Sequence, residues 1–140
     1  MDASEYNAMT LSESDEQIAL FRWAQLSSAA HKELDLLYHI PNGGKRNAAT
    51  AKRLKAEGVK PGVPDLCLPV ARGGYHSLYI ELKSGRNKPT ENQKKWIEGL
   101  NEQKNLAVVC WGWLEASDTI MDYLYGRLML NQQKGDKHDA

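Results

Sequence analysis

The chain has 140 residues, of which 41% are hydrophobic and 26% are charged. This length and composition exclude a disordered protein and a fibrous repeat, so we expect one domain across residues 1–140, with a core of about residues 12–130 and polar tails. The two cysteines, Cys67 and Cys110, exclude a disulfide framework and a four-ligand zinc site, and both lie in apolar runs where free cysteine packs as a small hydrophobe.

The formal net charge is zero, but the charges are unevenly distributed. Residues 1–38 carry seven acids and two bases, whereas residues 39–60 carry six bases and one acid. Because local potential rather than total charge attracts a phosphate backbone, DNA is an expected partner. No run approaches the roughly 20 apolar residues that cross a bilayer, and the start lacks a signal-peptide pattern, so we expect a cytoplasmic protein without a membrane partner.

The first expected elements are a helix and a short strand. Ser14 followed by Gln17 fits a capping box, and apolar spacing predicts a helix that continues to about residue 30. Residues 34–40, LDLLYHI, are an apolar run ended by the turn signal PNGG at residues 41–44. This run predicts a strand.

A basic helix and a hairpin are expected next. Residues 47–57 are rich in Ala, Lys and Arg, and Gly58 stands where a left-handed helix cap is expected. Residues 65–70 then predict a strand, and residues 72–74, RGG, a hairpin turn. The alternating pattern of residues 75–83 predicts the second strand of the hairpin.

The last expected elements are a helix, a strand and a helix. Thr90 and Gln93 fit a second capping box, which begins a helix that extends to about residue 104. Residues 106–111, LAVVCW, predict a buried strand, and residues 117–130 a closing helix with Tyr125 among its inward side chains. The order α-β-α-β-β-α-β-α predicts an α/β fold in which helices flank a mixed β-sheet.

Three side chains form the constellation expected to carry chemistry. Hydrolysis of a phosphodiester needs a divalent cation, an activated water and a positive group near the phosphate. In the predicted hairpin, Asp65 begins one strand and Glu81 lies near the end of the next, so their carboxylates lie side by side. Lys83 projects from the same face because strand side chains alternate. Leu82 points into the core, and its backbone carbonyl is a further candidate ligand for Mg²⁺.

An acid-x-Lys spacing alone is a weak signal. Glu102 and Lys104 have the same spacing, but on a predicted helix, where residues two apart do not face each other. Glu81 and Lys83 lie on a predicted strand, after an Asp that follows a Pro, and this context favours a site. The alternative is an ion pair on an exposed sheet face.

Several motifs in a fixed order are more specific than any one of them. They are Gly62-Val63-Pro64-Asp65-Leu66, Ile80-Glu81-Leu82-Lys83 and Thr90-x-x-Gln93, with Pro41-Asn42-Gly43-Gly44 upstream. The set resembles the VRR-NUC family, the virus-type replication-repair nucleases of the PD-(D/E)XK superfamily, over roughly residues 39–111. The resemblance implies a restriction-endonuclease-like core, dependence on Mg²⁺ or Mn²⁺, and cleavage of branched DNA. In stand-alone phage and bacterial members it implies a homodimer that acts on four-way (Holliday) junctions.

The resemblance also implies roles for single residues. Asp65 and Glu81 match the metal-binding acids of the family, and Lys83 matches its catalytic lysine. Gln93 matches a glutamine that approaches the active site from the next helix. Its alternative role is to close the capping box with Thr90, and one side chain can serve both purposes.

The family also places a metal-binding acid on its first helix. Glu16 is the best match here, and Glu13 and Asp15 compete with it. Glu16 equally suits a first-turn acid that complements the helix dipole.

Polar and basic side chains of the middle segment are the expected DNA contacts: Asn42, Lys45, Arg46, Lys52, Arg53 and Lys60. The alternative is that the charged ones form only a solvated helix face. The sequence thus predicts a Mg²⁺-dependent DNA endonuclease. The alternatives are a DNA-binding module that does not cut and an accessory subunit of a repair complex.

Overall fold

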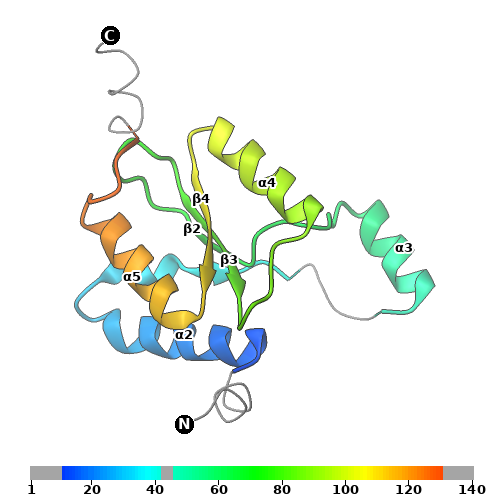
Figure 1. The fold of residues 1–140 in the computed structure, drawn as a ribbon, viewed down its shortest axis with the longest axis horizontal. Coiled ribbons are helices and arrows are strands. Elements are labelled where there is room, and N and C mark those ends of the chain that lie inside the picture. The colour runs from blue at the N-terminus through cyan, green and yellow to red at the C-terminus, as the bar shows by residue number, and fades with distance from the viewer. Residues whose placement is uncertain (1–10, 42–45, 131–140) are drawn as a thin grey trace.

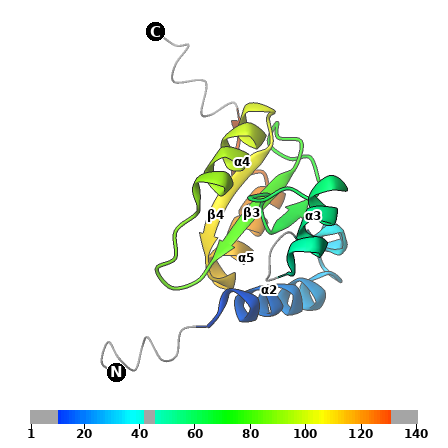
Figure 2. The same cartoon turned by 90° about the vertical axis from the view of Figure 1, so that its right-hand side faces the viewer.

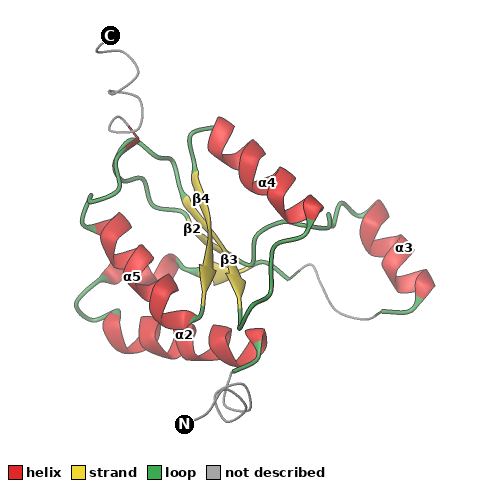
Figure 3. Ribbon diagram, in the orientation of Figure 1, coloured by secondary structure: helices red, strands yellow, loops and turns green. Residues whose placement is uncertain are grey.

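A mixed four-stranded sheet forms the centre of the computed structural model, which describes residues 11–41 and 46–130 (Figure 1; Figure 3). The strand order is β1-β2-β3-β4, in which β1, β2 and β3 are antiparallel and β3 and β4 are parallel. The strands are β1 (Tyr38–His39), β2 (Leu66–Leu68), β3 (Leu78–Lys83) and β4 (Leu106–Trp111).

Helices and strands alternate in the predicted order, α-β-α-β-β-α-β-α, so the α/β class is confirmed. A short 3-10 helix, η1 (Lys32–Leu36), is additional. In the described parts of the chain, no helix combines the length and apolar character that crossing a membrane requires. The α-helices are α2 (Glu13–Ser27), α3 (Ala48–Ala56), α4 (Glu91–Glu102) and α5 (Trp113–Leu124).

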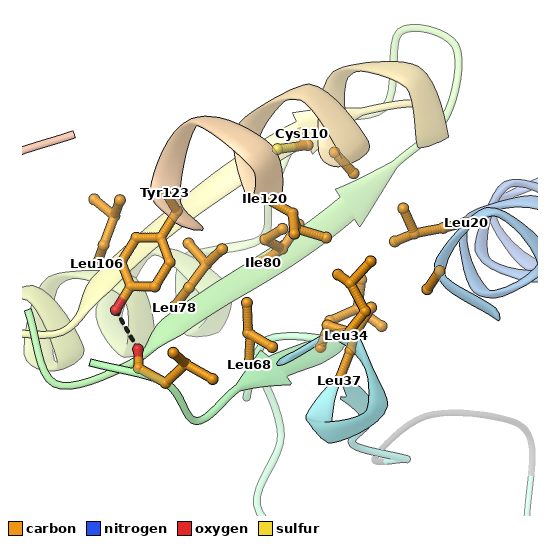
Figure 4. Packing of buried hydrophobic residues seen from close by; sticks show 14 of the residues in the cluster. Leu20, Leu34, Leu37, Leu68, Leu78, Ile80, Leu106, Cys110, Ile120 and Tyr123 are labelled. Carbon is orange, nitrogen blue, oxygen red and sulfur yellow. Dashed lines mark hydrogen bonds between the residues drawn. The ribbon is translucent and has the colours of Figure 1, made fainter. Parts of the chain in front are cut away.

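The hydrophobic core lies between one face of the sheet and the helices α2 and α5 (Figure 4). Leu78, Ile80 and Leu82 of β3 point to this face, and each is 1% exposed. Leu20 of α2 and Ile120 of α5 pack in the same cluster. Full burial of a Leu or Ile side chain contributes about 1.5–3 kcal/mol, so these contacts fix α2 and α5 against the sheet.

The opposite face of the sheet carries the polar side chains of β3. Strand alternation places Glu81 and Lys83 there. Helix α4 runs along β4, where the Asn101 side chain bonds both backbone groups of Ala107 at 2.9 and 3.1 Å (Figure 2). Asn101 thus occupies part of the edge of β4 that no strand pairs with in the described sheet.

Helix α2 differs from its predicted limits. The hydroxyl of Ser12, rather than Ser14, caps the helix by accepting the Asp15 N–H at 3.0 Å. The helix ends at Ser27 instead of near residue 30.

The strand predicted over residues 34–40 is only partly formed. Its first half belongs to η1, which buries Leu34 and is followed by the buried Leu37. A spacing of three residues places both side chains on one side of a 3-10 turn, so burial favours the turn over a strand. Only Tyr38–His39 pairs with β2.

The predicted hairpin is present, but its second strand is shorter. The turn at residues 72–74 is confirmed, because Arg72 and Tyr75 exchange backbone hydrogen bonds of 2.9 and 3.2 Å. Strand β3 begins at Leu78, three residues later than predicted. Pro69 ends β2 because it has no N–H to donate, so β3 has no antiparallel partner before Leu78.

Helix α5 is displaced from the predicted residues 117–130. It begins at Trp113, because Gly112 adopts a φ of 87° and a carboxylate oxygen of Glu16 accepts the Trp113 N–H at 2.6 Å. It ends before Tyr125, which was expected inward and is 60% exposed.

The basic helix α3 is formed as predicted. The Asn47 side chain caps it by accepting the Thr50 N–H at 2.7 Å, and Gly58 has a left-handed φ of 104°. None of its residues is buried, and Figure 1 shows α3 standing apart from the sheet.

Candidate active site

Asp65 and Glu81 come together where β2 meets β3. The antiparallel register pairs Leu66 with Ile80, so its continuation by one residue sets Asp65 opposite Glu81. One carboxylate oxygen of Asp65 also accepts the Leu82 N–H at 2.8 Å. The structure therefore brings the two predicted acids together.

His39, which the sequence did not assign to the catalytic set, contacts the backbone of Asp65. Its Nδ1 lies 2.9 Å from the Asp65 carbonyl oxygen, which also accepts the Ile40 N–H at 2.7 Å. These contacts are to the main chain, and they fix the backbone of Asp65 at the start of β2.

Lys83 lies next to Glu81, as the period of two residues predicts. Its Nζ is 3.6 Å from Glu81 Oε2, and the two side chains are 8% and 2% exposed. This burial excludes the alternative of an ion pair on an exposed sheet face. A buried pair is weak evidence for stability, because removing both charges from water is costly.

Gln93 contacts both the capping box and the acid. Its Oε1 accepts the Thr90 N–H at 2.8 Å, and the Thr90 hydroxyl accepts the Gln93 N–H at 3.2 Å. Its Nε2 donates to Glu81 Oε2 at 3.2 Å. The two roles left open by the sequence are therefore compatible in one side chain, because the cap holds the oxygen and directs the nitrogen at Glu81.

Burial raises the pKa of Glu81 from its ordinary value of 4.5 to about 8. Burial is the largest cause of this rise; a hydrogen bond with Asp65 and the negative charges of Asp65 and Glu13 contribute to it, and the charge of Lys83 opposes it. Glu81 thus retains its proton at neutral pH unless a further positive charge is placed beside it.

The arrangement around Glu81 fits a divalent cation. Oε1 of Glu81 is buried and has no hydrogen-bond donor among the described residues, so its ionised form needs a positive partner. Within residues 11–41 and 46–130, no group of three or more His, Cys, Asp or Glu side chains could hold a metal ion by itself. Asp65 and Glu81 supply two carboxylates, a donor set that fits Mg²⁺ because this ion binds through one or two carboxylates and keeps several waters.

Leu82 has the predicted orientation between the two polar residues of β3. Its side chain is in the core and its N–H is bonded to Asp65. Its carbonyl stays a predicted ligand.

Two acids of α2 face different parts of the structure. Oε2 of Glu16, the acid favoured by the sequence, accepts the Trp113 N–H at the start of α5. Glu13 instead accepts a hydrogen bond of 2.9 Å from Asn87 Nδ2, and its charge acts on Glu81. Of the two, Glu13 has the electrostatic contact with the site.

Gly62, in the motif that precedes Asp65, packs against the start of α4. Its φ is +93°, and a Cβ there would lie 2.6 Å from the backbone carbon of Asn92. Glycine allows the loop before β2 to touch the helix that carries Gln93, because it has no Cβ.

The predicted DNA contacts that the structure describes lie mainly on or beside α3. Asn42 and Lys45 lie outside the described residues. Arg46, Lys52 and Lys60 are exposed, and Arg53 is exposed with its Nε 3.6 Å from a carboxylate oxygen of Glu57. Most of this set belongs to α3 or its borders, which Figure 1 shows apart from the sheet.

Asn87 makes two long-range contacts that the sequence did not predict. Its side chain reaches Glu13 of α2, and its carbonyl accepts the indole N–H of Trp111 in β4 at 2.7 Å. No short motif indicates these contacts, because the partners are more than twenty residues away.

Comparison with known proteins identifies the family. The model of the VRR-NUC domain matches residues 10–113. A solved structure described as a VRR_NUC domain protein is 32% identical, with a TM-score of 0.72, over 83% of this chain and 90% of that chain. No curated protein matches the chain. With the acidic pair and lysine on β2 and β3, these matches show that the chain belongs to the VRR-NUC family of nucleases.

Proposed function

We propose that this protein is a metal-dependent DNA endonuclease that hydrolyses phosphodiester bonds in branched DNA, such as four-way junctions. One observation carries the chemistry: the buried Glu81 lies opposite the half-buried Asp65 and beside the buried Lys83, and Oε1 of Glu81 has no donor among the described residues. A cation against a scissile phosphate satisfies that oxygen. The preference for branched DNA is supported by the family resemblance.

The ligands that we propose for Mg²⁺, or Mn²⁺ in its place, are Asp65, Glu81 and the Leu82 carbonyl. We assign to Glu13, rather than Glu16, a contact with the ion through a bound water, because the charge of Glu13 acts on Glu81 whereas a carboxylate oxygen of Glu16 bonds the start of α5. The ion supplies charge for the developing transition state and lowers the pKa of a bound water.

The remaining roles belong to Lys83 and Gln93. Lys83 places an ammonium group beside Glu81, where it offsets charge on the phosphate and orients the attacking water. Gln93 holds Oε2 of Glu81 and leaves Oε1 free for the ion.

Cleavage of defined substrates tests the proposal. Plasmid, flap and four-way-junction DNA are incubated with the protein in MgCl₂, MnCl₂ or EDTA. We expect cleavage only with the metal and a loss of about 100-fold or more in Lys83→Ala. Lys104→Ala is a matched control, because Lys104 belongs to the second acid-x-Lys sequence and is exposed at the other end of β4. If wild type and Lys83→Ala are equally inert on all substrates, the enzyme proposal is wrong, and binding without cleavage then favours the DNA-binding module.

We also propose a homodimer, because symmetric resolution of a junction needs two sites related by a two-fold axis. Apolar side chains exposed on α2 and α5, such as Leu26 and Leu114, offer surface for such a contact. A mass measurement in solution tests it, and a monomer at all concentrations that support junction cleavage contradicts it.

A further inference from the structure

The loop of residues 84–89 connects β3, which carries Glu81 and Lys83, to α4, which carries Gln93. It follows Lys83 at the end of β3 and leads to Thr90, the N-cap of α4. Lys83 and Gln93, on either side of the loop, each approach Oε2 of Glu81. The loop therefore lies at the border of the candidate active site.

Asn87 fixes this loop to two other parts of the fold. Its side chain donates to Glu13 of α2, its carbonyl accepts the indole N–H of Trp111 in β4, and its own N–H bonds the Ser84 carbonyl at 3.1 Å. Three hydrogen bonds from one residue hold an otherwise exposed segment in one conformation.

The loop presents two exposed cations, Arg86 and Lys88. In the described ranges, neither lies within ion-pair distance of an acid. The acids near the loop have other partners. Glu13 accepts from Asn87, Glu91 pairs with Lys94 at 3.3 Å, and Glu115 accepts the Trp111 N–H at 2.9 Å.

We propose that the loop of residues 84–89 is a phosphate-contact loop, in which Arg86 and Lys88 bind the DNA backbone next to the scissile bond. The inference rests on the proposed nuclease function and adds a surface absent from the predicted DNA-binding set. Cations held by a fixed loop lose less conformational entropy on binding than cations on free chain, so they position the strand as well as attract it.

Salt-dependent DNA binding tests the loop. A fluorescent four-way junction and a linear duplex are titrated with the full chain in EDTA, and with CaCl₂, at several salt concentrations. Each phosphate contact contributes about 0.9 to the slope of log affinity against log salt, so Arg86→Gln with Lys88→Gln should lower the slope by about 2 and weaken binding on both substrates. Lys104→Gln, which removes an exposed charge at the far end of β4, should leave slope and affinity unchanged.

The outcomes separate this inference from the proposed function. If wild type binds and cuts DNA but the double variant has the same slope and affinity, the loop does not contact phosphate and the nuclease proposal stands. If wild type neither binds nor cuts any DNA, both fail.

A second variant tests the role of Asn87 as a positioning residue. Asn87→Ala keeps both cations but removes the bond to Glu13, so binding should weaken about 3-fold or more while the salt slope stays near that of wild type. Trp111→Phe removes the bond from the indole N–H to the Asn87 carbonyl and should weaken DNA binding in the same way as Asn87→Ala. Melting temperatures verify that both variants are folded, and wild-type affinity in both contradicts the fixed loop.

Discussion

The Glu81 carboxyl is placed where its ionised form is unfavourable. It is buried, it faces Asp65, and the ammonium group of Lys83 lies 3.6 Å from its Oε2. A buried carboxyl of this kind contributes little to stability, and strongly shifted pKa values of this kind cluster at functional sites. A carboxyl that becomes ionised only when a cation binds beside it has such a raised pKa in the cation-free protein.

The raised pKa of Glu81 predicts how stability depends on pH in metal-free protein. Between 4.5 and about 8 the folded protein keeps a proton that the unfolded chain loses. The folded state binds more protons there, so the free energy of unfolding falls as pH rises, and the fall ends above the folded pKa. In EDTA, the melting temperature should drop by about 5 °C or more across this window.

The matched variant is Glu81→Gln, which keeps the shape without the titrating group. Its melting temperature should lose most of this pH dependence and exceed that of wild type at pH 8. An unchanged pH profile in the variant contradicts the assignment of the shift to Glu81.

Variants of Thr90 and Gln93 should separate the structural role of the capping box from the role of Gln93 at the site. Thr90→Ala removes the cap hydroxyl and should cost about 1 kcal/mol of unfolding free energy while cleavage is retained. Gln93→Glu keeps an oxygen for the Thr90 N–H but places a carboxylate against Glu81, so cleavage should fall about 10-fold or more. Urea unfolding measures the structural role, and cleavage rates measure the role at the site. A wild-type cleavage rate in Gln93→Glu would mean that Gln93 serves only to cap α4.

At the scale of elements, the start of α5 depends on a residue of α2. Oε2 of Glu16 bonds the first N–H of α5, a group that has no partner within the helix. This contact and the negative charge at a helix N-terminus both stabilise α5. Glu13, one turn earlier, is directed to Asn87 and Glu81.

Variants of these two acids should therefore have opposite effects. Glu16→Ala should lower the free energy of unfolding by about 1–2 kcal/mol and keep the rise in melting temperature that Mg²⁺ produces. Glu13→Ala should change stability less and reduce the Mg²⁺ response. The reverse result, with the response lost only in Glu16→Ala, makes Glu16 the ligand, as the sequence first suggested.

The contact between the loop before β2 and α4 requires glycine. Gly62→Ala combines a left-handed φ with a Cβ 2.6 Å from the Asn92 backbone, whereas Gly58→Ala has a similar φ and nothing within 4 Å. Gly58→Ala should cost about 1 kcal/mol from backbone strain. Gly62→Ala should cost distinctly more, and equal urea midpoints for the two variants contradict the close packing.

At the scale of the molecule, α3 stands apart from the sheet and buries none of its residues. Its charged side chains are thus available for DNA without disturbing the core. Lys52→Gln with Arg53→Gln should leave the free energy of unfolding within about 0.5 kcal/mol of wild type and lower the salt slope of DNA binding by about 2. Unchanged DNA affinity in this variant means that α3 is only a solvated helix.

The sequence by itself determined the features that depend on short spacing. Glu81 and Lys83 share a face because they are two apart on a strand, and Thr90 caps Gln93 because they are three apart at a helix start. The hairpin predicted from the turn at residues 72–74 brought Asp65 and Glu81 to the same end of the sheet, because its two strands run antiparallel. These relations are local, or depend on a single turn.

Only the tertiary structure decided which acid of α2 faces Glu81, where α5 begins and what Asn87 contacts. Glu13 and Glu16 have equivalent local patterns, and the rotation of α2 on the core distinguishes them. The start of α5 was misplaced because its cap lies 97 residues away in the chain. Such contacts follow from how the core packs, and no periodicity within one segment encodes them.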